Sequence, residues 1–134
     1  MPKKEFTSFD IAAAVKELKG LVLESRVNNI YQFGPKTVLF KLHKIDQPPI
    51  RLVVEAGRRL HSTVYIEESP AEPPPFCMML RQYLRGAWLV GLEQYEFERI
   101  IVLSFKTKTG LLRLIVELFG DGNFILINPE NVII

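Results

Sequence analysis

Cysteine is almost absent from this sequence, which has a single one, Cys77, in 134 residues. One cysteine excludes an internal disulfide and any zinc site built from several cysteines, and it suits a reducing compartment. No apolar run reaches the roughly 18 residues that a membrane helix needs. No apolar segment follows Met1–Lys4 either, as it would in a signal peptide. These absences predict a cytoplasmic protein with no membrane partner.

Net charge and catalytic motifs are also scarce. The formal net charge is only +2, so a polyanion site would have to come from local clustering of cations. The sequence has no Gly-x-Ser-x-Gly, P-loop, His-Glu-x-x-His or Gly-x-Gly-x-x-Gly motif. His43 and His61 lack the spacing and the acidic neighbours of a metal site. We therefore expect a binding module and not an enzyme, with no catalytic residue, no metal ligand, no cofactor and no small-molecule substrate.

Two segments have helical periodicity. In the first, Thr7 and Asp10 match a capping box, and an apolar stripe follows at Ile11, Val15, Leu18 and Val22. In the second, FCMMLRQYLRG, a buried face is predicted at helical spacing, made of Phe76, Met79, Leu80, Tyr83 and Leu84. Arg81 and Arg85 lie four residues apart on the opposite face, which predicts two cations that project together toward solvent or a polyanion.

Strand signals fill the rest of the chain. Four short strands separated by Gly and Pro turns are predicted between the helices, at Arg26–Phe33, Thr37–His43, Ile50–Ala56 and Leu60–Ile66. Four more follow the second helix, at Trp88–Leu92, Tyr95–Phe105, Leu111–Leu118 and Phe124–Ile127. Between the two sets lies an acidic, proline-rich segment, 67–75, which predicts an extended and mobile loop.

The order helix, four strands, helix, four strands predicts an α+β fold. The simplest arrangement is two antiparallel β-sheets packed face to face, with the two main helices covering an end or an edge. At this length residues 1–134 form one domain. The chain stops on an apolar run, 132–134, which predicts a fragment of a longer multidomain protein.

Three charged residues allow two interpretations each. Asp10 is either only the capping carboxylate of the first helix or also a carboxylate presented at a binding surface. Glu98 and Arg99 are adjacent in a predicted strand, so their side chains should point to opposite faces. Arg99 falls on the face that appears buried, where it needs a carboxylate partner or a place at the rim of the sheet. A buried ion pair and a functional site both fit this pattern.

Other cations form local clusters. One contains Arg58, Arg59 and His61, another contains Arg81 and Arg85, and a third contains Lys106, Lys108 and Arg113. Each is readily explained as solvated surface. If two of these clusters converge in space, they would make a phosphate-binding patch.

With these segments in view, the chain resembles the N-terminal domain of the NFACT family of ribosome-associated quality-control proteins, also called fibronectin-binding protein A N-terminal. The matching segments occur in the family's order and extend over nearly all of residues 6–128. They are FTSFDIAAAVKELKG, RVNNIYQF, the FCMMLRQYLRG block, QYEFERII and LIVELFGDGNFIL.

The resemblance implies a fold, a function and partners. The family's domain is similar to the N-terminal domain of formamidopyrimidine-DNA glycosylases. Its full-length proteins bind stalled large ribosomal subunits and recruit tRNA for untemplated C-terminal tailing of the nascent chain. A helix-start aspartate and an Asp-Arg pair are linked there to tRNA engagement. They carry over to Asp10, Arg99 and Glu98, the last of which replaces the family's aspartate by a longer carboxylate.

Two alternatives remain open beside an RNA- and ribosome-binding module. A DNA-repair glycosylase would use Pro2 as its nucleophile, but Lys3 follows and the helix starts several residues later. A surface adhesin is implied by the family's older label, but the chain has no signal peptide. The resulting RNA-binding candidates are Asp10, Glu98 and Arg99, with Arg81 and Arg85 as possible phosphate contacts.

Overall fold

The computed structural model describes residues 7–63 and 72–134. In them the order of elements is the predicted one: helix, four strands, helix, four strands. The bounds are α1 Ser8–Val22, β1 Ser25–Gln32, β2 Thr37–His43, β3 Ile50–Glu55, β4 Arg59–Thr63, α2 Pro75–Leu84, β5 Trp88–Gln94, β6 Ile100–Thr107, β7 Gly110–Glu117 and β8 Asn123–Ile127. The end of the strand predicted at Leu60–Ile66 and most of the loop predicted at 67–75 lie outside the described residues.

The strands form one antiparallel sheet and not two. Its order is β4-β3-β2-β1-β5-β6-β7-β8, with each strand hydrogen-bonded to the next. The α+β class is confirmed, but the prediction of two separate sheets is not. The two sets of strands are the two halves of a continuous sheet, which meet where β1 pairs with β5.

The junction between the halves is short. β1 pairs with β2 from Arg26 to Gln32, whereas its register with β5 covers only Ser25 and Arg26. The amide of Val27 still donates to the carbonyl of Ala87 (2.8 Å), just before β5. Beyond this point α2 contacts β1, so the halves separate around the helix. A sequence pattern shows two groups of strands but not this short shared edge.

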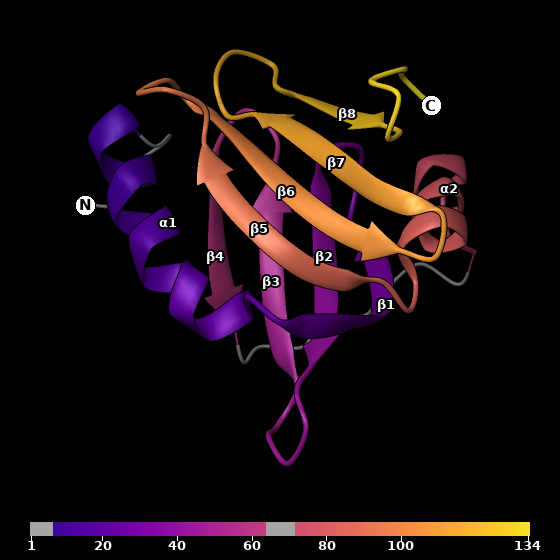
Figure 1. Ribbon diagram of the computed structural model, residues 1–134. Helices are drawn as coiled ribbons and strands as arrows, with labels where there is room; N and C mark the ends of the chain where they lie inside the picture. The colour runs from indigo at the N-terminus through magenta and orange to yellow at the C-terminus, as the bar shows by residue number, and fades with distance from the viewer. Residues whose placement is uncertain (1–6, 64–71) are drawn as a thin grey trace.

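The two halves face one another across a common core. The rings of Phe40 on β2 and Phe105 on β6 stack with centroids 5.7 Å apart, although two other strands separate β2 from β6 in the sheet. Both side chains are fully buried. Figure 1 shows the β5–β8 half crossing in front of the β1–β4 half. Burial of large aromatic faces between the halves therefore holds the bent sheet closed.

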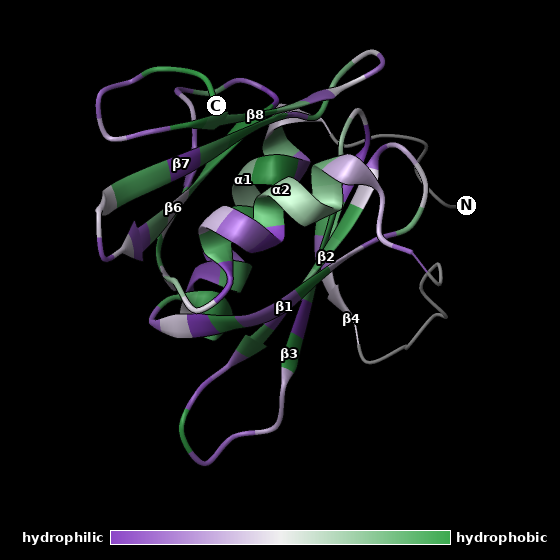
Figure 2. Ribbon diagram, turned by 90° about the vertical axis from the view of Figure 1, so that its right-hand side faces the viewer, coloured by the Kyte–Doolittle hydropathy of each residue, from purple (hydrophilic) through white to green (hydrophobic). Residues whose placement is uncertain are grey.

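The helices fill opposite ends of the space between the halves (Figures 1 and 2). All four apolar residues predicted for the first stripe are buried in α1, which contacts β3, β4 and β5. In α2 the buried residues are Cys77, Leu80 and Leu84, so Tyr83 was wrongly placed on the buried face. The buried side of α2 is centred toward Cys77, and Tyr83, 39% exposed, lies at its margin.

Two turns also meet across the halves. The amide of Gly57, between β3 and β4, donates to the carbonyl of Glu117 at the end of β7 (2.9 Å). A Cβ on Gly122, between β7 and β8, would lie only 2.0 Å from the nitrogen of Gly57. Gly122 also has φ +74°, a left-handed conformation that glycine adopts without strain. Glycine is therefore required here both by the backbone and by the contact.

Candidate functional site

The first helix begins with the predicted capping box. The amide of Asp10 donates to Thr7 Oγ1 (3.2 Å), and Asp10 Oδ2 accepts from the amide of Thr7 (2.9 Å). Thr7 Oγ1 also lies 3.0 Å from Asp10 Oδ2. The carboxylate thus satisfies amides at the helix N-terminus, where the helix dipole favours negative charge. This structural role does not remove Asp10 from the surface, because the residue is only half-buried.

Glu98 and Arg99 lie in the loop between β5 and β6, not in a strand. β6 begins at Ile100, five residues later than predicted, so the prediction that the two side chains point to opposite faces of a strand was wrong. The loop is a turn in which the amide of Glu98 donates to the carbonyl of Tyr95 (3.0 Å). Glu96 has φ +50°, a conformation that ends strand pairing. Alternating apolar residues before Ile100 had suggested a longer strand.

Arg99 lies at the rim of the sheet, one of the two positions that the sequence allowed for it. It is half-buried, and its guanidinium carbon is 6.0 Å from the centroid of the Phe119 ring. Its carbonyl accepts a hydrogen bond from the amide of Leu118 (2.8 Å). The backbone of Arg99 is therefore fixed against the end of β7, while the neighbouring Glu98 is exposed.

A glutamine joins this loop to the start of α1. Nε2 of Gln94, the last residue of β5, donates to the carbonyl of Ser8 (3.0 Å) and to the carbonyl of Glu98 (2.8 Å). The rings of Phe9 and Phe97 meet edge to face with centroids 4.9 Å apart. The structure thus brings the segment of Asp10 together with the segment of Glu98 and Arg99. We call this region, residues 7–10 and 94–99, the α1–loop surface.

Aromatic side chains are prominent on the α1–loop surface. Phe9 is 76% exposed, and Phe97 and Tyr95 are 52% and 53% exposed. Large exposed aromatic rings are unusual unless they contact a partner. Sequence reasoning missed Gln94, for which there was no signal. Phe9 could have been found, because it lies outside the apolar stripe of its helix.

Arg81 lies on α2 and Arg85 is the C-cap residue of that helix, at the other end of the molecule from α1. Arg81 Nε donates to the carbonyl of Ile30 on β1 (2.7 Å), and Arg85 donates to Oδ1 of Asn29 (2.7 Å). Arg81 is half-buried and lies over the ring of Tyr31. The prediction that both project together toward solvent or a polyanion was therefore wrong for Arg81, which covers an edge of β1. Arg85 is exposed.

The two arginines of the first predicted cation cluster form ion pairs within the fold. Arg58 and Arg59 are both within ion-pair distance of Glu55, at 3.5 and 3.4 Å. Burial raises the pKa of the Cys77 thiol, against the opposing charges of Arg81 and Arg85. Across residues 7–63 and 72–134 no three His, Cys, Asp or Glu side chains gather as metal ligands would. In the same residues neither helix is long and apolar enough to cross a membrane.

Comparison with known proteins identifies relatives over nearly the whole chain. Residues 7–134 match the family model described as NFACT N-terminal and middle domains. The archaeal Rqc2 homolog aRqcH of Methanocaldococcus jannaschii is 35% identical over 137 residues, covering 98% of this chain and 20% of that protein. The human ribosome quality control complex subunit NEMF is 34% identical over 132 residues, again covering 98% of this chain but 12% of that protein.

Solved structures have the same fold. The N-terminal part of the fibronectin/fibrinogen-binding protein from Streptococcus suis superposes with a TM-score of 0.88 at 27% identity. That match covers 97% of this chain and 52% of the solved chain. The N-terminal domain of the fibronectin-binding protein PavA from Streptococcus pneumoniae gives a TM-score of 0.83 at 29% identity, covering 91% and 49%. The similarity to formamidopyrimidine-DNA glycosylases stays a prediction.

The chain spans about an eighth to a fifth of the length of these two quality-control relatives. The match to the family model extends from the capping box of α1 to the end of the described residues. The relatives that are 34–35% identical to this chain favour neither the glycosylase nor the adhesin alternative. The chain belongs to the family of NFACT N-terminal and middle domains.

Proposed function

We propose that this chain is the tRNA-engaging, non-catalytic module of a cytoplasmic ribosome-associated quality-control factor. The factor binds stalled large ribosomal subunits and recruits tRNA for untemplated C-terminal tailing of the nascent chain. The names of the relatives support a role in ribosome-associated quality control, since NEMF is a ribosome quality control complex subunit. In this proposal peptide-bond formation remains with the ribosome, and the chain contributes binding and orientation.

The observation that carries the proposal is the bridge made by Gln94. The side-chain amide of Gln94 donates to the backbone carbonyls of both Ser8 and Glu98, two residues that are far apart in sequence. Asp10 and Arg99 belong to the two segments joined in this way. The three charged residues that the family resemblance links to tRNA thus share one surface, together with exposed aromatic rings.

The chemistry of the α1–loop surface suits unpaired nucleotides. Arg99 offers charge-assisted hydrogen bonds to a phosphate or to a base edge. The carboxylates of Asp10 and Glu98 repel phosphates, so their favourable contacts with RNA are with the amino groups of bases. The exposed rings of Phe9 and Phe97 offer faces on which splayed bases can stack. We therefore assign a loop of tRNA, and not its duplex stems, to this surface.

Substitution of Arg99 tests the assignment. In the full-length protein, Arg99→Ala should weaken tRNA binding about 5- to 150-fold, the loss of about 1–3 kcal/mol expected for one such contact. Glu98→Asp restores the family's usual residue and should bind at least as well as the wild type. Lys16→Ala removes an exposed cation of α1 outside the surface and should have little effect. Unchanged tRNA affinity in a folded Arg99→Ala variant would refute the assignment.

A further inference from the structure

We propose that a second surface of this chain, around α2, is a binding groove for the phosphate backbone of RNA. Its cations are Arg26 at the start of β1, Arg85 at the end of α2 and Lys108 in the turn between β6 and β7. The inference rests on the proposed function in taking RNA as the ligand. It concerns a different surface, because α2 and α1 lie at opposite ends of the molecule.

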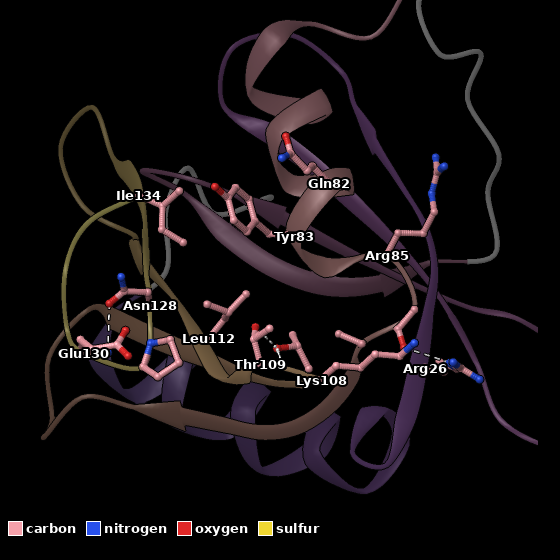
Figure 3. A pocket seen from close by; sticks show the side chains of 14 residues that line it. Arg26, Gln82, Tyr83, Arg85, Lys108, Thr109, Leu112, Asn128, Glu130 and Ile134 are labelled. Carbon is pink, nitrogen blue, oxygen red and sulfur yellow. Dashed lines mark hydrogen bonds between the residues drawn. The ribbon is translucent and has the colours of Figure 1, made fainter.

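The groove is a hollow of about 760 Å³ beside α2. Figure 3 shows Arg26 and Lys108 at one end of the groove and Glu130 at the other; Arg85 lies at the rim of the same end as Arg26, with its side chain directed outward. A second hollow of about 310 Å³ adjoins that end, shares Arg26 and Arg85 and adds His43. Positive charge is therefore gathered at the end where the groove continues, and the one carboxylate in its lining lies away from it. One member of each of two cation clusters expected from the sequence, Arg85 and Lys108, lines this groove.

The two arginines are held in place without being neutralised. Arg26 Nε donates to the carbonyl of Gly86 (2.9 Å), and its guanidinium lies 5.5 Å from the centre of the Trp88 ring. Arg85 is held by Asn29, as described above. Within residues 7–63 and 72–134, no carboxylate forms an ion pair with Arg26, Arg85 or Lys108. Each arginine keeps donors for an incoming anion and has lost part of its freedom beforehand, which lowers the entropy cost of binding.

The turn that carries Lys108 is also ordered. Thr107 Oγ1 donates to the carbonyl of Gly110 (2.7 Å) and accepts from the amide of Thr109 (3.3 Å). Lys108 itself is exposed. A rigid turn with one exposed lysine, at the same end of the groove as two fixed arginines, fits an extended polyanion better than a single small anion.

RNA is the polyanion that these features favour. Trp88 is 41% exposed and Tyr83, which lines the groove, is 39% exposed, so aromatic surface accompanies the cations. Backbone contacts position a nucleic acid without reading its sequence. The groove would then add affinity, while the α1–loop surface supplies the preference for tRNA.

The salt dependence of RNA binding tests this proposal in the full-length protein. Affinities for tRNA and for a plain RNA duplex are measured over a range of salt concentrations. The double variant Arg85→Ala/Lys108→Ala should lower the slope of log K against log salt by about 2 for both RNAs, since each phosphate contact contributes about 1. The double control Lys16→Ala/Lys44→Ala, which removes the same charge outside the groove, should leave the slope unchanged. Circular dichroism verifies that each variant is folded.

The outcomes separate this inference from the proposed function. If Arg99→Ala weakens tRNA binding but the groove variant leaves both slopes unchanged, the groove is refuted and the proposed function stands. If duplex RNA is bound with the expected slope change but tRNA has no preference, the groove stands and the proposed tRNA role fails. If poly-glutamate competes as well as RNA at equal charge, an acidic protein segment is the occupant and the RNA groove is refuted. If neither RNA binds, both proposals are overturned.

Discussion

Gln94 provides a sharp test of how the α1–loop surface is assembled. Its Nε2 donates to two carbonyls, of Ser8 and Glu98, and Gln94→Glu replaces this donor by an acceptor. Two hydrogen bonds with a net contribution of about 0.5–1.5 kcal/mol each are lost. The new carboxylate then faces two carbonyl oxygens at about the same positions. We expect the loop to be destabilised by about 2 kcal/mol, because half-burial of Gln94 lets water replace part of the loss.

Hydrogen exchange of the full-length protein measures this loss locally. The amides of Tyr95 and Glu98 are bonded within the loop, to Ile100 and Tyr95. A loss of about 2 kcal/mol should accelerate their exchange about 30-fold. Gln47→Glu makes the same chemical change in the exposed turn between β2 and β3 and should not affect them. Unchanged exchange at 95–98 in Gln94→Glu would refute the view that Gln94 joins the loop to α1.

Three further predictions concern the scaffold. Phe40→Ala removes a fully buried ring that stacks on Phe105 and should lower the free energy of unfolding by about 3–5 kcal/mol. Chemical denaturation measures this loss as a lower midpoint, and an unchanged midpoint would show that this contact does not hold the halves together. Gly122→Ala should lower the free energy of unfolding by more than about 3 kcal/mol, because the new Cβ meets the opposing turn. Gly20→Ala, in open space on α1, should instead raise it by about 0.5–1 kcal/mol. Equal effects of the two substitutions would contradict the contact between the turns. Burial raises the pKa of the Cys77 thiol, so as the pH rises past the usual pKa of a thiol the unfolded chain loses this proton before the folded protein does. The free energy of unfolding should therefore fall in that pH range, and Cys77→Ala should remove this part of the fall.

The order and type of the elements could be predicted because each has a local cause. The capping box at Thr7 and Asp10 fixes where α1 starts, and the stripe that follows is buried as its spacing requires. The same local logic failed at 95–99. Tyr95, Phe97 and Arg99 alternate like a strand, but the turn is set by hydrogen bonds to Gln94 and Ile100 and by the conformation of Glu96.

The joining of the sheet and of the site could not be predicted for a related reason. Both depend on contacts between residues far apart in sequence. The junction is a two-residue register between β1 and β5, and Arg81 is drawn to the edge of β1 by the carbonyl of Ile30. Helical spacing places Arg81 opposite the apolar stripe, but it gives no information on which neighbouring strand offers an unpaired acceptor. The family resemblance supplied Asp10 and Arg99 as candidates but not the glutamine that brings their segments together.

The proposed function requires that the α1–loop surface contacts tRNA. The most direct measurement is hydrogen exchange of the wild-type full-length protein with and without saturating tRNA. We expect slower exchange in residues 95–100 and at the start of α1, with β3 and β4 unchanged, because bound RNA covers the loop and restricts its opening. Protection elsewhere in the protein, with unchanged exchange at 95–100, would contradict the claim.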